Sequence, residues 1–128
     1  MSHIVTAVKR FFVAPSATPE EMAAIAKRVD SMIESAPIAV FSKSYCPYCV
    51  KAKKILSDKG QSANMKVLEL DHDPAGDAIQ TYLAKKQGVG RVTVPQIYIS
   101  THLVGGCSDL TALSTAQLDK MLAGLPKL

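Results

Sequence analysis

The sequence predicts an α/β fold in which a four-stranded mixed sheet is flanked by helices on both faces. Segments with helical periodicity alternate with short apolar or β-branched segments along most of the chain. A predicted helix separates the first two strands, so these should be parallel, whereas a short gap separates the last two, which should form an antiparallel hairpin. With 128 residues, the chain is long enough for one domain with its own core.

The first predicted helix follows Thr18, which can serve as its N-cap. Pro19 suits the first helical position, and Glu21 can complete a capping box. Pro37 ends the helix. Between these signals, the apolar residues at helical spacing are Met22, Ile25, Val29, Met32 and Ile33. We therefore predict one amphipathic helix that ends near residue 35.

A short apolar run at residues 38–41 is predicted to be a buried strand. A second helix should run from Pro47 to Lys59, because proline suits a helix start and Gly60 supplies a C-terminal stop. The residues of this helix that we expect to face inward are Val50, Ile55 and Leu56.

The second strand is predicted at residues 65–70, where apolar and polar residues alternate loosely. A third helix should follow soon after it. We expect Asp73 to be the cap of this helix and Pro74 its first residue, and Gly88 to close it.

Two β-rich runs, 96–99 and 102–104, form the predicted hairpin. Ser100 and Thr101 lie between them. Neither residue type favours the positive φ angles of the common two-residue hairpin turn, so we expect a different turn.

Two short helices should end the domain. The glycines at 105–106 end the preceding β-rich run, and Ser108 or Asp109 can cap the first of these helices. The sequence at 114–117 forms a capping box for the last helix, which should end near residue 123.

Residues 1–17 are predicted to be a flexible N-terminal extension, and residues 18–128 a single domain. The extension carries Lys9 and Arg10 and no acidic residue, a composition that also suits a mitochondrial transit peptide. The two basic residues interrupt the first apolar run, which argues against a secretory signal. We therefore expect a reducing, cytoplasmic environment, with the mitochondrion as the alternative.

The composition is typical of a globular protein, with 48% hydrophobic and 20% charged residues. A net charge of +4 favours small anionic ligands. Aromatic residues make up only 5% of the chain and tryptophan is absent, so few side chains could stack on bases and no nucleic-acid partner is expected. No apolar run approaches the roughly 18 residues that span a bilayer, so no membrane partner is expected either.

Two of the three cysteines, Cys46 and Cys49, are separated only by Pro47 and Tyr48. A structural zinc site needs four ligands, usually as two paired sets. The chain has no second pair, because Cys107 stands alone and the histidines are scattered. We therefore expect no metal. In a reducing compartment a close cysteine pair is more often redox-active than a structural disulfide, so Cys46 and Cys49 are predicted to exchange electrons with a substrate.

The predicted strand–loop–helix order gives the two sulfurs different roles. Cys46 falls at the first turn of a helix, where unsatisfied N–H groups and the helix dipole favour negative charge, and Lys43 and Lys51 add positive potential. Such surroundings lower the pKa of a thiol from about 8.5 to between about 3.5 and 7.5. Cys49, one helical turn further on, should be more buried and more protonated. We predict that Cys46 attacks and Cys49 resolves the mixed disulfide.

Three motifs of the chain resemble those of the dithiol glutaredoxins. They are residues 43–49 (Lys-Ser-Tyr-Cys-Pro-Tyr-Cys), 93–95 (Thr-Val-Pro) and 105–109 (Gly-Gly-Cys-Ser-Asp). The order and separation of the three motifs also resemble those of this family, and the resemblance covers roughly residues 18–125. The resemblance implies a thioredoxin fold. It also implies a glutathione-dependent thiol-disulfide oxidoreductase that reduces disulfides and protein–glutathione mixed disulfides.

The resemblance further implies a binding site for glutathione. A cis bond before Pro95 would present the Val94 backbone to the cysteinyl part of glutathione. Lys43 would meet the glycine carboxylate, whereas Ser108 and Asp109 would hold the γ-glutamyl end. The other residues expected at this site are Tyr48, Thr93, Gly106 and Cys107.

Two residues of this predicted site, Arg91 and Cys107, have more than one possible role. Arg91 stands where many relatives carry Gln; it could bind the glycine carboxylate, select a more anionic substrate or point into solvent, and we favour the first. Cys107 is expected to be a small buried apolar residue. Glutathionylation or an intermolecular disulfide at Cys107 are the alternatives.

No permanently bound cofactor is expected, since glutathione or a related low-molecular-weight thiol would act as co-substrate. The expected partners are glutathione and disulfide-bonded or glutathionylated proteins, and the chain is expected to be a monomer. The alternative function is that of an iron–sulfur carrier, because some glutaredoxins bridge a [2Fe–2S] cluster between two subunits with the first cysteine and glutathione. Pro47 argues against this alternative, because cluster-binding members often have Gly or Ser there.

Overall fold

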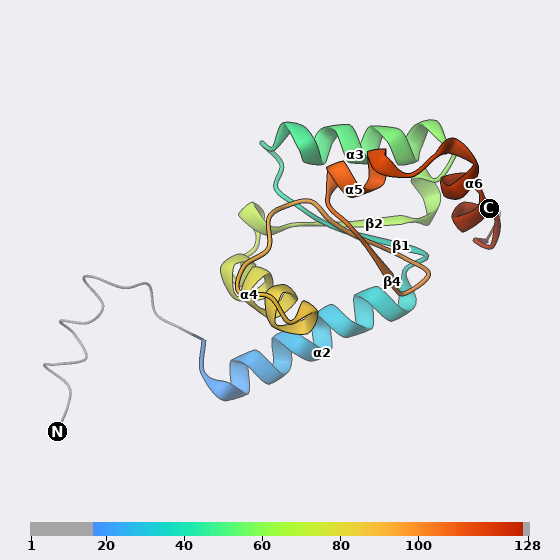
Figure 1. Ribbon diagram of the computed structural model, residues 1–128. Coiled ribbons are helices and arrows are strands. Elements are labelled where there is room, and N and C mark those ends of the chain that lie inside the picture. The colour runs from blue at the N-terminus through green and yellow to red at the C-terminus, as the bar shows by residue number, and fades with distance from the viewer. Residues whose placement is uncertain (1–16, 127–128) are drawn as a thin grey trace, which may run out of the picture.

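The computed structural model describes residues 17–126, which form a three-layer α/β fold (Figure 1). β1 pairs parallel with β2 and antiparallel with β3, and β3 pairs antiparallel with β4, in the order β2-β1-β3-β4. The predicted mixed sheet is therefore confirmed. Its strands are β1 (Ile38–Ser42), β2 (Met65–Glu69), β3 (Gln96–Ile99) and β4 (His102–Gly105).

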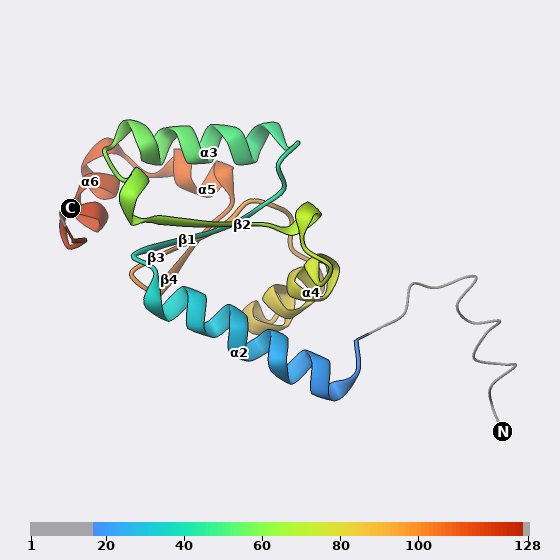
Figure 2. The same cartoon turned by 180° about the vertical axis from the view of Figure 1, so that it is seen from behind.

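Helices cover both faces of the sheet (Figures 1 and 2). The helices on one face are α2 (Pro19–Ser35) and α4 (Gly76–Gln87), and those on the other are α3 (Pro47–Asp58), α5 (Cys107–Ala112) and α6 (Thr115–Ala123). Two short 3₁₀ turns flank β2, namely η1 (Ser62–Asn64) and η2 (Leu70–His72). No helix within residues 17–126 has the length and apolar character needed to cross a bilayer. Residues 1–16 of the predicted extension lie outside the described residues.

The alternation of side chains along β1 divides the core into two parts. Ala39 and Phe41 pack with residues of α2 and α4, and Phe41 meets Tyr98 edge to face with 6.2 Å between ring centroids. Ile38 and Val40 pack with residues of α3, α5 and α6. All five residues of β1 are buried. A strand buried on both faces is apolar at nearly every position, which is why the apolar run at 38–41 predicted it.

Two helices begin where their capping boxes predicted. At the start of α2, the Glu21 N–H donates to the Thr18 hydroxyl (3.1 Å) and the Thr18 N–H donates to the Glu21 carboxylate (2.9 Å). Ser114 and Gln117 make the same two hydrogen bonds at the start of α6, at 3.1 and 2.8 Å. Each pair supplies a partner for N–H groups that the helix itself leaves free.

The predicted start of the third helix was wrong. α4 begins at Gly76 rather than at Pro74, and Asp73 does not cap it. The Asp73 carboxylate instead accepts a hydrogen bond from the Ala75 N–H (2.9 Å) and forms an ion pair with Arg28 of α2. Asp73 therefore ties the turn before α4 to α2, and the helix begins only after that turn is complete.

Two smaller predictions were also wrong. Ser100 and Thr101 adopt positive φ angles of 50° and 70°, as a two-residue hairpin turn requires. The Ser100 N–H donates to the Pro37 carbonyl (2.9 Å), so a contact outside the hairpin helps to hold this turn. In α3, Val50 is exposed rather than inward-facing, and Cys49 and Ala52 are buried instead.

Gly76 is predicted to be intolerant of a side chain. A Cβ there would lie 2.9 Å from the backbone carbonyl carbon of Leu70 and closer still to its oxygen. We expect Gly76→Ala to lower the free energy of unfolding by about 1–3 kcal/mol, the usual cost of overpacking, as measured by urea titration. Gly124→Ala is the control, because a Cβ at Gly124 meets nothing within 4 Å. Equal stability of the two variants would contradict this prediction.

Candidate active site

Cys46 lies between the end of β1 and the start of α3. It is the N-cap residue of α3, and Pro47 occupies the first turn. The Cys46 N–H donates to the Lys43 carbonyl (3.0 Å), which closes the connection between strand and helix. The residue is partly exposed, and its sulfur lies 4.0 Å from the Val94 carbonyl oxygen. A partly exposed thiol at a helix start is accessible to a substrate disulfide.

The surroundings of Cys46 favour its thiolate. Burial acts to raise the pKa of this thiol, but the N–H and thiol of Cys49, the N–H of Tyr48 and the charge of Lys43 together outweigh it. The pKa of Cys46 therefore lies below the ordinary value for cysteine. Hydrogen bonds from the first turn of α3 account for most of this lowering, because they stabilise the charged sulfur.

Cys49 has the opposite properties. It is completely buried, and its sulfur accepts a hydrogen bond from the Lys43 N–H (3.5 Å). Burial raises the pKa of Cys49 in spite of that hydrogen bond and the nearby Ser42 hydroxyl, and the Cys46 thiolate raises it further. The pKa values of the two thiols, which are separated by one turn of helix, are therefore shifted in opposite directions, and Cys46 is the more acidic of the two.

The segment before β3 lies beside Cys46. The peptide bond between Val94 and Pro95 is cis, as the family resemblance implied. Thr93 and Val94 line both of two grooves, and Cys46 lines the first of them. An extended ligand could therefore run from one groove to the other across the Val94 backbone.

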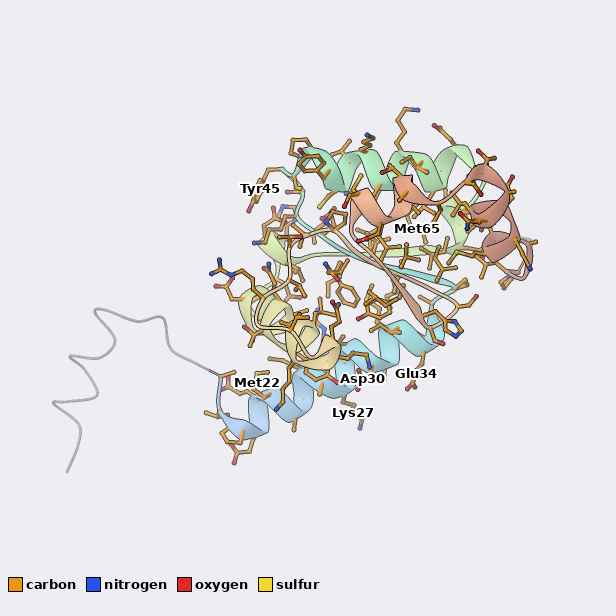
Figure 3. All side chains as sticks on the ribbon, viewed as in Figure 1. Met22, Lys27, Asp30, Glu34, Tyr45 and Met65 are labelled. Atoms are coloured by element: carbon orange, nitrogen blue, oxygen red, sulfur yellow. The ribbon has the colours of Figure 1, made fainter. Side chains whose placement is uncertain are left out.

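The first groove has a volume of about 630 Å³ and is lined in part by Cys46, Lys43 and Arg91. Arg91 thus lies on a groove wall that it shares with Lys43, and the single acidic residue of this lining is Asp77. Tyr45 also lines the groove and projects outward from the loop before α3 (Figure 3). The cationic wall suits an anionic group of a ligand.

The second groove has a volume of about 560 Å³ and runs from the start of α3 to the start of α5. Eight of the predicted site residues line it: Tyr48, Thr93, Val94, Pro95, Gly106, Cys107, Ser108 and Asp109. Cys107 is almost completely buried and packs in the core next to Leu110, as expected of a small apolar residue.

The prediction that Ser108 or Asp109 is the cap residue of this helix was wrong, because α5 begins at Cys107 and its N-cap is Gly106. Asp109 reaches back from inside the helix, and its carboxylate accepts a hydrogen bond from the Gly106 N–H (2.9 Å). At Gly105, where φ is +116°, a Cβ would lie 2.7 Å from the Asp109 Cγ. A glycine is therefore required beside this carboxylate.

One group of residues near Cys46 was missed by the sequence analysis. Asp71 accepts hydrogen bonds from the N–H (2.9 Å) and the hydroxyl of Ser44, two residues before Cys46. These bonds hold the pKa of Asp71 below its usual range. The Ser44 hydroxyl also lies 3.2 Å from His72 Nε2. The sequence could have indicated that Asp71 lies near Cys46. Asp71 follows β2, Cys46 follows β1, and the carboxyl ends of two parallel strands meet at one edge of a sheet.

Gln80 was missed as well. It lies on α4, lines the first groove and donates a hydrogen bond to the Val92 carbonyl (2.8 Å). This bond fixes the segment that carries Arg91 against α4. Nothing in the local sequence distinguishes Gln80 from an ordinary surface residue of a helix.

Comparisons with known proteins agree with this geometry. Residues 38–104 match the family model described as Glutaredoxin. The chain is 45% identical over 105 residues to Glutaredoxin-1 of Rhizophagus irregularis, a match that covers 81% of this chain and 100% of the relative. It is 43% identical over 106 residues to Glutaredoxin-2 of Schizosaccharomyces pombe, covering 81% and 93%.

Solved structures of glutaredoxins also match this chain. A buckwheat glutaredoxin, crystallised as a complex with glutathione, matches with a TM-score of 0.75 and 33% identity over 84% of this chain and 94% of that one. A wheat glutaredoxin matches with a TM-score of 0.73 and 40% identity over 82% and 95%. With the fold, the cysteine pair and these relatives in agreement, the chain belongs to the glutaredoxin family.

Proposed function

We propose that this protein reduces disulfides and protein–glutathione mixed disulfides, with Cys46 as the nucleophile, Cys49 as the resolving thiol and glutathione as co-substrate. Membership of the family makes the chain a thiol-disulfide oxidoreductase. The observation that supports the roles of the two cysteines is their unequal environment. Cys46 is partly exposed with a lowered pKa, whereas Cys49 is buried with a raised pKa.

The reaction would begin when the Cys46 thiolate attacks a sulfur of the substrate. The substrate disulfide breaks, one half leaves as a thiolate, and the other half stays bound to Cys46 as a mixed disulfide. When the bound half is glutathione, a second glutathione attacks the sulfur of that bound glutathione, which releases the Cys46 thiolate and forms oxidised glutathione. Alternatively, Cys49 attacks the Cys46 sulfur and releases the bound half. When Cys49 attacks, the enzyme ends as a Cys46–Cys49 disulfide, which two glutathione molecules reduce.

The two grooves suit the two ends of glutathione, which carries a carboxylate at each end and an amine at one. In this proposal Lys43 and Arg91 bind the glycine carboxylate in the first groove. Ser108 and Asp109 bind the γ-glutamyl end in the second. The Val94 backbone pairs with the cysteinyl unit between them. The buckwheat relative supports glutathione as the ligand, because its structure is a complex with glutathione.

Three further points stay predictions. Disulfide-bonded or glutathionylated proteins are expected to be the macromolecular substrates. The protein is expected to work as a monomer. A cytoplasmic location, with the mitochondrion as the alternative, depends on residues 1–17, most of which lie outside the described residues.

The roles of the cysteines can be tested by single substitutions. Cys46→Ser should abolish reduction of a small glutathione mixed disulfide, because the other two cysteines, Cys49 and Cys107, are buried. Cys49→Ser should retain activity, because glutathione can resolve the Cys46 mixed disulfide directly. The measurement is the initial rate at which oxidised glutathione forms. Activity in the Cys46 variant together with its loss in the Cys49 variant would contradict the assignment.

The pKa of Cys46 can be tested by alkylation. Iodoacetamide reacts with the thiolate, so the rate should rise with pH and reach half its maximum at a pH below the ordinary pKa of cysteine. Lys43→Gln should move this midpoint to higher pH, because the Lys43 charge helps to lower the pKa of Cys46. Lys54→Gln is the matched control, since Lys54 is exposed on α3 and pairs with Asp58 (2.9 Å). An unchanged midpoint in the Lys43 variant would contradict this electrostatic role.

The proposed role of Arg91 predicts a change in substrate binding. Arg91→Gln should raise KM for a glutathione mixed disulfide about two- to fivefold and leave kcat unchanged, since one exposed ion pair is worth about 0.2–1 kcal/mol. Lys85→Gln, on the exposed end of α4, is the control for loss of positive charge. A KM that changes equally in the two variants would indicate a general electrostatic effect and not contact by Arg91.

A further inference from the structure

A buried glutamine lies directly after the cis peptide bond, at the start of β3. Gln96 is 6% exposed and is one of three buried polar residues within residues 17–126. It pairs with Phe41 of β1, so its side chain points to the face of the sheet that α2 and α4 cover. A side-chain amide in such a place needs hydrogen-bond partners, because burial without them is costly.

Both ends of the Gln96 carboxamide are hydrogen-bonded. Its Nε2 donates to the Thr93 carbonyl (2.8 Å). Its Oε1 accepts a hydrogen bond from Nε2 of Gln87, the last residue of α4 (2.8 Å). The same Gln87 nitrogen donates to the Tyr98 hydroxyl (3.3 Å). Since a carboxamide donates only at its nitrogen and accepts only at its oxygen, Gln87 fixes the orientation in which Gln96 donates to Thr93.

The Thr93 carbonyl belongs to the same peptide group as the Val94 N–H. A peptide group is planar, and in the trans form its C=O and N–H point in opposite directions. Within residues 17–126 the one cis bond is Val94–Pro95, so the Thr93–Val94 bond is trans. Because the Thr93 oxygen points toward the buried Gln96 side chain, the Val94 N–H points away from it. No backbone carbonyl within the same residues accepts a hydrogen bond from this N–H.

The preceding peptide group is held in a similar way. Gln80 of α4 donates to the carbonyl of Val92, which is itself buried. Two consecutive peptide groups of a segment outside any helix or strand are therefore fixed by glutamine side chains. Arg91 and Val94, on either side of these groups, both line the first groove. The shape of the groove wall thus depends on side-chain amides that lie behind it.

We propose that Gln96 is a positioning residue, which orients the Thr93–Val94 peptide group so that the Val94 N–H donates to the peptide backbone of the substrate. The inference rests on the proposed function, in which the Val94 backbone pairs with the cysteinyl unit of glutathione. Gln96 touches neither the substrate nor the reacting sulfurs and acts through Thr93. Substrates with amide groups beside the disulfide should therefore depend on Gln96, whereas a disulfide without amide groups should not.

Two disulfides that differ in this respect test the proposal. Oxidised glutathione has amide groups on both sides of each cysteinyl unit, and bis(2-hydroxyethyl) disulfide has none. Reduced protein carrying Cys49→Ser, in which the mixed disulfide on Cys46 persists, is mixed with each disulfide in turn. The reaction is quenched with acid at successive times, and the mixed disulfide is measured by mass spectrometry.

Gln96→Met keeps the length of the side chain but removes both hydrogen bonds of the carboxamide. Its rate with oxidised glutathione should fall about two- to tenfold, the effect expected from one hydrogen bond to the substrate. Its rate with the small disulfide should not change. A purely structural role would slow the two reactions equally, because both need the same Cys46 sulfur.

The orientation of the peptide group can also be measured without any substrate. The residual dipolar coupling of the Val94 N–H, in weakly aligned isotope-labelled protein, reports the direction of that bond. It should agree with the structure in the wild type and differ in Gln96→Met. Gln87→Met is a second variant, at the end of α4, that removes only the support of the Gln96 carboxamide. It should change the coupling and the glutathione rate in the same sense but less.

Gln61→Met is the matched control. The Gln61 side chain is also half-buried and accepts a hydrogen bond from Asn64 (2.8 Å), but it lies beyond the C-terminal end of α3, opposite the end that carries Cys46. Both rates and the coupling should stay unchanged in this variant.

The outcomes separate this proposal from the proposed function. An unchanged coupling in Gln96→Met would overturn the proposal, as would an equal slowing with both disulfides. A changed coupling without any slower reaction with oxidised glutathione would instead contradict the pairing of glutathione with Val94, which belongs to the proposed function.

Discussion

The position of Cys46 at the N-cap of α3, in front of the N–H groups of the first turn, is the constraint on which the site depends. N–H groups at a helix start have no partner within the helix, so they are available to a negative charge placed there. Tyr48 and Cys49 supply these groups, and Cys46 occupies the cap position in front of them. Because all five residues of β1 are buried, the turn that carries Cys46 extends directly from the core.

Much of this arrangement could be predicted because it depends on neighbours in the chain. The helix starts at Thr18 and Ser114 depend on hydrogen bonds across three residues, so the capping boxes identified them. The unequal environments of Cys46 and Cys49 follow likewise from their positions at the start and on the buried side of one helix. The buried strand at residues 38–41 was recognisable because burial on both faces makes it uniformly apolar.

Two of the errors involve contacts between residues far apart in the sequence. Asp73 looked like a helix cap, but Arg28, 45 residues away, competes for its carboxylate. Ser100 and Thr101 tolerate positive φ angles in a turn that the Pro37 carbonyl helps to hold.

The hydrogen bonds between Asp71 and Ser44 have a consequence for the timing of catalysis. They fix the backbone two residues before Cys46 from the end of the neighbouring strand, so contacts within the protein itself position Cys46, the proposed nucleophile. In the language of enzyme kinetics the site is preorganised: the entropy needed to align the sulfur is lost when the protein folds, and not at each turnover.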